Sequence, residues 1–147
     1  MKSIYAITAT SVGGRNGHVI SDYNLIDADI GLPESFGGTD DKHLTPEAFL
    51  AAGYAACFDN AVIHIISKER VKTGTPVITA KVDLIQLGTD SFGLAIELEV
   101  EIPGVEHKAA VEIVNKAHQI CPFSNATRGN IDVKLTVNKW SLSNQIF

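Results

Sequence analysis

The order of hydrophobic and polar positions along the chain predicts strands at both ends and in the middle. Residues 3–12 and 18–26 are rich in β-branched and aromatic residues and flank a glycine cluster, so they predict an opening β-hairpin. Residues 76–87 and 92–102 predict a second strand pair, because charged and apolar residues alternate along them. Residues 130–140 alternate again and predict a last strand.

A long helix is predicted from Thr45 to about Glu69. Thr45 suits the N-cap, Pro46 suits the first helical position, and the charge of Glu47 favours the first turn of a helix. Residues 48–58 are apolar on every side of this helix and include many small side chains. Because such a helix can be approached from several directions, we expect it in the middle of the molecule.

A second helix is predicted over residues 106–121, where apolar residues recur at helical spacing. Pro122 ends this pattern, because proline disfavours the α conformation at the residue before it. Cys121 is therefore expected at the inner edge of the helix C-terminus. Residues 31–42 lie between the predicted hairpin and the first helix. Their hydrophobic residues follow neither a helical nor a strand period, so we expect an irregular surface loop. The order of elements predicts an α+β fold in a single domain, residues 1–147.

Composition excludes several classes of protein. The chain has 147 residues, of which 45% are hydrophobic and 20% charged, as expected for a folded globular domain. Its net charge is −5, its pI is about 5.4, and it contains no run of Lys or Arg, so we expect neither nucleic acid nor membrane as partner. The apolar run of the first helix is interrupted by Asp59, Asn60 and His64, which favours a buried helix over a membrane span.

The two cysteines, Cys57 and Cys121, are too few for a secreted disulfide scaffold, and the N-terminal residues lack the pattern of a signal peptide. We therefore expect a cytoplasmic protein. Each cysteine could be an ordinary buried residue, but both lie on inward faces and can meet. If they meet, two interpretations are possible: a redox-active dithiol, or a metal site that also uses His64 and His118. A structural disulfide is disfavoured in the reducing cytoplasm.

Three segments closely resemble the organic hydroperoxide resistance proteins of the OsmC/Ohr family. They are the glycine cluster 13–17, the run 45–58 with its Ala-Ala-Cys-Phe sequence, and the segment 121–130 that begins Cys-Pro. The resemblance spans nearly the whole chain. Departures are small: Phe123 stands where many relatives have Tyr, and Ser91 stands where Gly is common.

The resemblance implies a role for four residues. Cys57 matches the peroxidatic cysteine, Cys121 the resolving cysteine, Arg15 the activating arginine, and Glu47 its carboxylate partner. It further implies a thiol peroxidase that reduces organic hydroperoxides without a metal or cofactor and is recycled by a lipoyl-type dithiol, on a lipoylated protein or as dihydrolipoamide. The implied assembly is an intertwined homodimer whose long central helices are wrapped by antiparallel β-sheets.

The chemistry of the four side chains suits these roles. A thiolate in an apolar core is unreactive unless a fixed cation favours it, which Arg15 can do because it keeps its proton, and a buried arginine requires a partner such as Glu47. Apolar walls favour alkyl or lipid peroxides over hydrogen peroxide. Alternatives are the osmotically inducible branch of the family, a non-catalytic thiol sensor, and a binder of small apolar ligands.

One distance bears on the assembly. Glu47 and Cys57 are ten residues apart on one predicted helix, which is about 15 Å along the axis and roughly 80° around it. The two side chains cannot share a site on a straight helix, so either another copy of the chain or a bend must intervene. We therefore expect a two-fold dimer in which Arg15 and Glu47 of one subunit serve Cys57 of the other.

Overall fold

The structure, a computed structural model, describes residues 2–139 of the chain. The chain forms two compact units, one ending at Phe49 and one beginning at Leu50. Each unit contains its own three-stranded sheet. Helix α1 (Pro46–Glu69) begins in the first unit and continues through the second.

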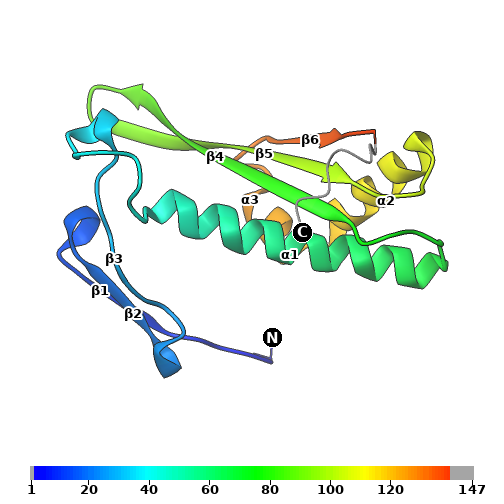
Figure 1. Cartoon of the computed structure of the whole chain (residues 1–147), viewed down its shortest axis with the longest axis horizontal. Coiled ribbons are helices and arrows are strands. Elements are labelled where there is room, and N and C mark those ends of the chain that lie inside the picture. The colour runs from blue at the N-terminus through cyan, green and yellow to red at the C-terminus, as the bar shows by residue number, and fades with distance from the viewer. Residues whose placement is uncertain (1, 140–147) are drawn as a thin grey trace. The chain divides into compact units, whose positions relative to one another are not determined.

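The first unit contains the sheet β1-β2-β3, with strands β1 (Ala9–Val12), β2 (His18–Ser21) and β3 (Asp27–Asp29) (Figure 1). The predicted hairpin is confirmed, since β1 pairs antiparallel with β2. The prediction of one strand over 18–26 is wrong, because β2 ends at Ser21 and a 3-10 turn follows at Asp22–Asn24 (η2). Strand β3 begins after the predicted strand and pairs antiparallel with β2. In this turn Tyr23 has φ 58° and Asn24 has φ 52°, a left-handed conformation that no strand contains. The loop after β3 holds one 3-10 turn, η3 (Glu34–Phe36).

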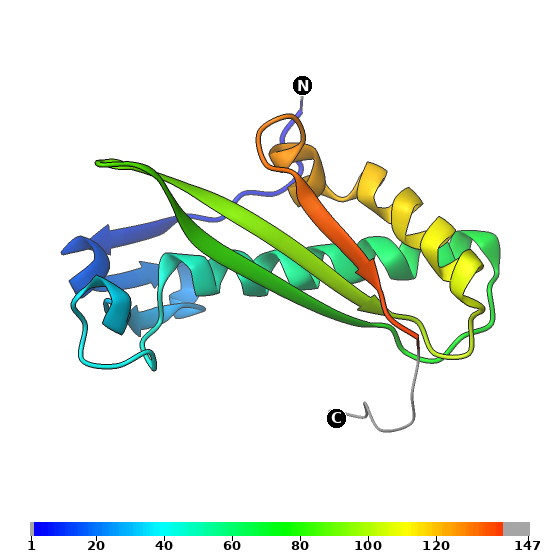
Figure 2. The ribbon, with the colours of Figure 1, turned by 90° about the horizontal axis from the view of Figure 1, so that it is seen from above.

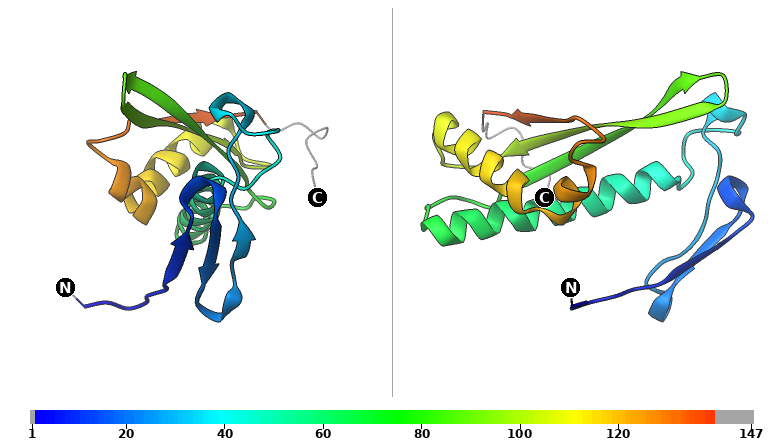
Figure 3. Two further views of the ribbon diagram at one scale, coloured as in Figure 1. Left: turned by 90° about the vertical axis from the view of Figure 1, so that its left-hand side faces the viewer. Right: turned by 180° about the vertical axis from the view of Figure 1, so that it is seen from behind.

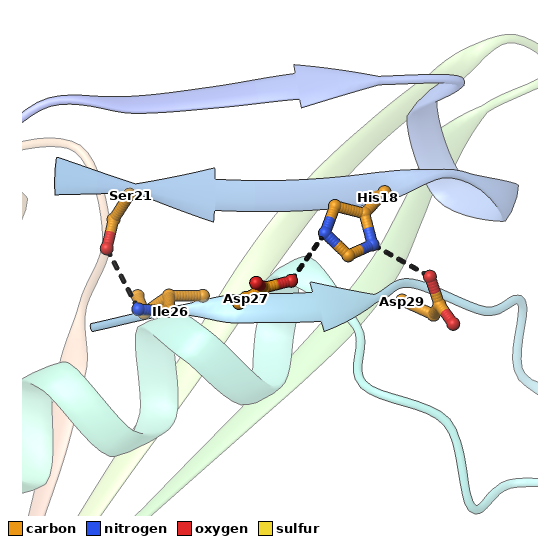
Figure 4. A network of polar contacts seen from close by, with 5 residues as sticks. All are labelled: His18, Ser21, Ile26, Asp27 and Asp29. Carbon is orange, nitrogen blue, oxygen red and sulfur yellow. Dashed lines mark hydrogen bonds and ion pairs between the residues drawn. The ribbon is translucent and has the colours of Figure 1, made fainter. Parts of the chain in front are cut away.

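His18 ties β2 to β3 through two carboxylates. Its Nδ1 lies 2.8 Å from Asp29 Oδ1, and its Nε2 lies 2.8 Å from Asp27 Oδ1 (Figure 4). The hydrogen bond with Asp29 raises the pKa of His18, and the contact with Asp27 raises it further. Across the same strand pair, the backbone N–H of Ile26 donates to Ser21 Oγ at 2.9 Å. These contacts fix the β2–β3 register in which His18 is opposite Asp29.

The second unit contains the sheet β4-β5-β6, with strands β4 (Val77–Gly88), β5 (Ser91–Glu101) and β6 (Val133–Val137). Strands β4 and β5 form the predicted antiparallel pair. The expected antiparallel pairing is found in every described strand pair but one, since β6 pairs parallel with β5. The chain crosses from β5 to β6 through helices, and a crossover of this kind returns the next strand in the same direction. Trp140, the last residue of the predicted final strand, lies outside the described residues.

The helices agree with the sequence except at one point. The prediction for α1 is confirmed, and the hydroxyl of Thr45 accepts the backbone N–H of Ala48 at 3.2 Å as an N-cap does. The predicted second helix is α2 (His107–Ile120), whose N-cap is the Glu106 side chain. A third helix, α3 (Pro122–Thr127), was not predicted. Pro122 ends the pattern of α2, but it also occupies the first position of α3, where a proline is favourable.

The core of the second unit lies between helices and sheet. Figure 1, and Figure 3 at left, show α1 and α2 on the same side of the β4-β5-β6 sheet, and Figure 2 shows β4 and β5 crossing above α1. The buried residues of β5 are Ile96, Leu98 and Val100, which alternate with glutamates on the other face. They pack with buried residues of both helices; on α1 these are Tyr54, Phe58, Ala61, Val62, Ile65 and Ile66.

Helix α1 is long and apolar enough to cross a membrane, and among residues 2–139 it is the one helix of which this is true. A core helix has the same length and composition. Six residues of α1 are buried in the core of the second unit. The prediction of a helix buried on every side is not met within one chain, because only 33% of its most apolar stretch is buried.

Candidate active site

Two thiols meet in the core of the second unit. Cys57 lies in the middle of α1 and Cys121 lies between α2 and α3, and their Sγ atoms are 3.6 Å apart. Both are free thiols. Cys121 is fully buried, whereas Cys57 is partly exposed. The structure therefore brings the two predicted cysteines together, and solvent reaches only one of them.

Cys121 is held by the ends of two helices. Its backbone N–H donates to Ala117 O at 2.9 Å as the C-cap of α2, and its carbonyl accepts the N–H of Asn125 at 2.9 Å as the N-cap of α3. Its backbone is extended, with φ −63° and ψ 126°, as Pro122 requires of the residue before it. This bend between the helices turns the Cys121 side chain into the core beside α1.

Burial raises the pKa of Cys57, because a thiolate is poorly stabilised away from water. The backbone amide of Phe123 hydrogen-bonds the sulfur and lowers the pKa, and the adjacent Cys121 raises it again. The overall direction is upward. Within the second unit, Cys57 is therefore a thiol at neutral pH, and its reaction as a nucleophile requires a further positive charge.

Arg15 and Glu47 form a bidentate ion pair in the first unit. Arg15 Nη1 donates to Glu47 Oε2 at 3.0 Å, and Arg15 Nη2 donates to Glu47 Oε1 at 2.5 Å. Glu47 is 15% exposed and Arg15 36% exposed. Hydrogen bonds from Arg15 lower the pKa of Glu47, and the same bonds raise the pKa of Arg15. Both groups therefore stay charged at neutral pH, and the guanidinium is fixed in orientation.

The local backbone explains how the pair forms. Arg15 lies in a 3-10 turn, η1 (Gly14–Asn16), which follows Gly13 at φ 84° and begins with Gly14 at φ 62°. Glycine adopts such left-handed conformations at no steric cost, which is the role of the glycine cluster. A pocket of about 400 Å³ lies beside Arg15. Its lining is mostly apolar and consists of Ser11, Gly14, Arg15, Val19, Ile30, Pro46 and Phe49.

A buried polar network next to the cysteines was not predicted from the sequence. The Tyr54 hydroxyl lies 2.9 Å from Ser124 Oγ, and Ser124 Oγ lies 2.9 Å from His118 Nδ1. Tyr54 and Ser124 have no exposed surface. The available signal was their spacing, since each of these three residues is three positions from a cysteine.

The sequence left a metal site open, with His64 and His118 beside the cysteines. His64 is exposed on α1, while His118 Nδ1 contacts Ser124. Within the described part of the chain, no three His, Cys, Asp or Glu side chains are grouped so that they could hold a metal ion.

The four predicted site residues thus form two pairs, Arg15 with Glu47 in the first unit and Cys57 with Cys121 in the second. One pair offers a fixed cation beside an apolar pocket. The other offers a dithiol at the distance from which a disulfide forms after a small movement.

Comparison with known proteins gives the family. Residues 38–136 match the family described as OsmC-like protein. The chain is 40% identical over 137 residues to the organic hydroperoxide resistance protein of Xanthomonas axonopodis pv. citri, a match that covers 92% of this chain and 96% of that one. It is 41% identical over 136 residues to the organic hydroperoxide resistance protein OhrA of Bacillus subtilis, covering 91% and 96% of the two chains. The chain therefore belongs to the OsmC-like family.

Solved structures agree. The organic hydroperoxide resistance protein of Elizabethkingia anophelis superimposes with a TM-score of 0.90 at 48% identity, over 95% of this chain and 100% of that one. OhrB of Bacillus subtilis superimposes with a TM-score of 0.83 at 37% identity, over 92% and 100%. The resemblance read from the three motifs is confirmed, and so is the α+β fold.

Proposed function

We propose that the chain is a thiol peroxidase that reduces organic hydroperoxides to alcohols. The observation that carries the proposal is the 3.6 Å separation of the Cys57 and Cys121 sulfurs, in a chain whose relatives are named organic hydroperoxide resistance proteins. Two thiols at this distance can supply the two electrons that cleave an O–O bond.

The reaction has two steps. The Cys57 thiolate attacks the distal oxygen of the peroxide, so that an S–O bond forms, the O–O bond breaks, and the alkoxide leaves as the alcohol after taking a proton. Cys57 is now a sulfenic acid. The Cys121 sulfur then attacks the Cys57 sulfur; an S–S bond forms, the S–O bond breaks, and the hydroxyl leaves as water with the thiol proton. Peroxide and two thiols become alcohol, water and a disulfide.

Exposure supports the assignment of the two roles. The attacking sulfur must be reached by peroxide, and Cys57 is the partly exposed cysteine, whereas Cys121 is 0% exposed. A buried thiol suits the resolving role, because it is protected from peroxide until its partner is oxidised. We therefore assign the first step to Cys57 and the second to Cys121.

Arg15 is proposed to stabilise the Cys57 thiolate, and Glu47 to orient Arg15. Burial raises the pKa of Cys57, so a nearby permanent cation is needed for reaction at neutral pH. Arg15 stays protonated, and its two hydrogen bonds with Glu47 fix the direction of the guanidinium. The apolar pocket beside Arg15 suits the alkyl part of a hydroperoxide.

The remaining parts of the proposal concern partners. We propose a dithiol of the lipoyl type as reductant, no resident metal or cofactor, a cytoplasmic location, and a homodimer. One observation favours the dimer: only 33% of the most apolar stretch of α1 is buried in a single chain, which leaves apolar surface for a second copy.

A turnover assay tests the proposal. Purified protein is given cumene hydroperoxide, a fatty-acid hydroperoxide or hydrogen peroxide, each with dihydrolipoamide, thioredoxin or glutathione as reductant. We expect sustained turnover of the two organic peroxides with dihydrolipoamide and slower turnover of hydrogen peroxide. A protein that consumes one equivalent of peroxide and then stops with every reductant is a sensor, which contradicts the proposal.

A further inference from the structure

Tyr54, Ser124 and His118 form a chain of hydrogen bonds that we call the hydroxyl–imidazole bridge. Tyr54 lies three residues before Cys57 on α1, His118 three residues before Cys121 on α2, and Ser124 three residues after Cys121 on α3. The bridge therefore joins three helices at points next to the two sulfurs, and Figure 1 shows α3 beside the middle of α1.

Each member of the bridge is held by further contacts. Tyr54 and Ser124 are fully buried, so each hydroxyl needs a partner inside the protein. The Tyr54 hydroxyl also lies 3.4 Å from Thr127 Oγ1, and the Tyr54 ring packs edge-on against Phe123 at 5.6 Å between centroids. Arg128 donates to the backbone carbonyl of His118 at 2.7 Å.

The break between α2 and α3 is where such support is needed. Pro122 has no N–H, so no helical hydrogen bond passes through this position, and the backbone of Cys121 is extended. The contact of His118 with Ser124 spans the break from one helix to the other. The contact of Tyr54 with Ser124 then fixes α3 to α1, the helix that carries Cys57.

We propose that the hydroxyl–imidazole bridge positions Cys121 for attack on oxidised Cys57. The sulfurs are 3.6 Å apart and a disulfide requires about 2.05 Å, so they must approach by about 1.5 Å. A bridge tied to both sides of Cys121 keeps this movement short and directed. Tyr54, Ser124 and His118 are thus positioning residues, and they take no part in the first step. This inference rests on the proposed function.

Loss of the bridge has a chemical consequence. If Cys121 attacks more slowly, the sulfenic acid on Cys57 lives longer and can react with a second peroxide to give a sulfinic acid, which the dithiol does not reduce. The bridge therefore protects the enzyme from inactivation during turnover. Its effect is expected on the ratio of disulfide to sulfinic acid, and not on the consumption of the first peroxide.

Two substitutions remove single hydroxyls with little change of shape. Tyr54→Phe keeps the ring that packs on Phe123, and Ser124→Ala removes only Oγ. We expect disulfide formation to slow by about three- to tenfold in each, the range for one net hydrogen bond, with an unchanged rate of first oxidation. Tyr23→Phe, at a residue that is 92% exposed, and Ser67→Ala, at an exposed position of α1, are the matched controls.

His118 supplies a pair of variants at a site that is not fully buried. His118→Asn keeps a polar group near the position of Nδ1 and should restore most of the disulfide rate, whereas His118→Leu should not. This comparison separates hydrogen bonding from packing, and it remains informative if a variant at a fully buried position fails to fold.

The measurement is the reaction of the reduced protein with excess cumene hydroperoxide and no reductant, quenched with an alkylating reagent and analysed by intact mass spectrometry, which resolves thiol, disulfide and sulfinic acid. The expected result is more sulfinic acid in Tyr54→Phe, Ser124→Ala and His118→Leu than in the unsubstituted protein. Equal ratios in all of them would overturn the bridge proposal. Absence of any disulfide in the unsubstituted protein would instead overturn the proposed function.

Discussion

The sulfurs of Cys57 and Cys121 lie 3.6 Å apart although 64 residues separate them in sequence. Two strands and one helix lie between them along the chain, and the fold returns Cys121 to the middle of α1. The two thiols differ in exposure, so the geometry that brings them together also makes them unequal.

The first prediction concerns that inequality. Cys57→Ser should abolish peroxide reduction, because Cys57 is the partly exposed cysteine and is assigned to attack. Cys121→Ser should still consume about one equivalent of peroxide and then stop as a sulfenic acid or a mixed disulfide. Mass spectrometry of the peroxide-treated variants measures both outcomes. Equal single-turnover reactivity of the two variants contradicts the assignment.

The second prediction concerns Arg15. An opposite charge nearby lowers a pKa by about 1–3 units, so Arg15→Gln should slow the first step at pH 7 by about 10- to 1,000-fold through loss of thiolate. The loss should shrink as pH rises, because the thiolate then forms without help. Stopped-flow rates from pH 6 to 10 test this, with Arg15→Lys as the variant that keeps the charge and loses the bidentate geometry. A loss that is independent of pH would show that Arg15 does not act through the thiolate.

The third prediction concerns assembly. Arg15→Ala and Cys57→Ser should each be nearly inactive. If the Arg15–Glu47 pair of one subunit serves Cys57 of the other, mixing the two variants under conditions that exchange subunits restores one good site per heterodimer. We expect recovered activity, measured as peroxide consumption with dihydrolipoamide. Mixing each variant with itself is the control. Continued inactivity after proven exchange would mean that each site is built within one chain.

The fourth prediction concerns His18. Its carboxylate partners raise its pKa above the ordinary value of about 6.5, so the protonated ring binds Asp27 and Asp29 more strongly than the neutral ring does. This stabilisation is complete below the unfolded pKa and is lost as pH rises through the folded pKa. Hydrogen exchange at the β2–β3 amides should therefore quicken with rising pH more than the intrinsic rate does. The excess should vanish in His18→Gln and persist in His64→Gln, which changes an exposed histidine of α1.

Local patterns sufficed for most elements, whereas the family resemblance supplied both site pairs. Thr45, Pro46 and Glu47 mark the start of α1, and alternation marks β4 and β5. These signals lie within a few residues of the structure that they specify. Three motifs resemble the OsmC/Ohr family, and this resemblance paired Cys57 with Cys121 and Arg15 with Glu47.

The features that the sequence did not predict depend on longer-range contacts or on turn geometry. The parallel pairing of β6 follows from the crossover through α2 and α3, which no window of sequence reveals. The strand over 18–26 was predicted too long, and β3 was not predicted, because the left-handed pair Tyr23 and Asn24 carries no glycine to mark the turn. Ser124 lies in a segment for which the sequence predicted no helix or strand, and its partner Tyr54 is 70 residues away.

In the proposed redox cycle, the bend that places Cys121 beside α1 also makes the reduced and oxidised forms differ in their resistance to unfolding. A disulfide between residues 64 positions apart encloses β4, β5 and α2 in one covalent loop, and cross-linking a loop of this length stabilises a folded chain by about 4 kcal/mol in the chain-entropy description. The oxidised protein is then the harder of the two forms to unfold. Reduction of the disulfide removes this cross-link. The reduced form, which is ready for the next peroxide, is therefore also the form that proteases and heat attack more easily.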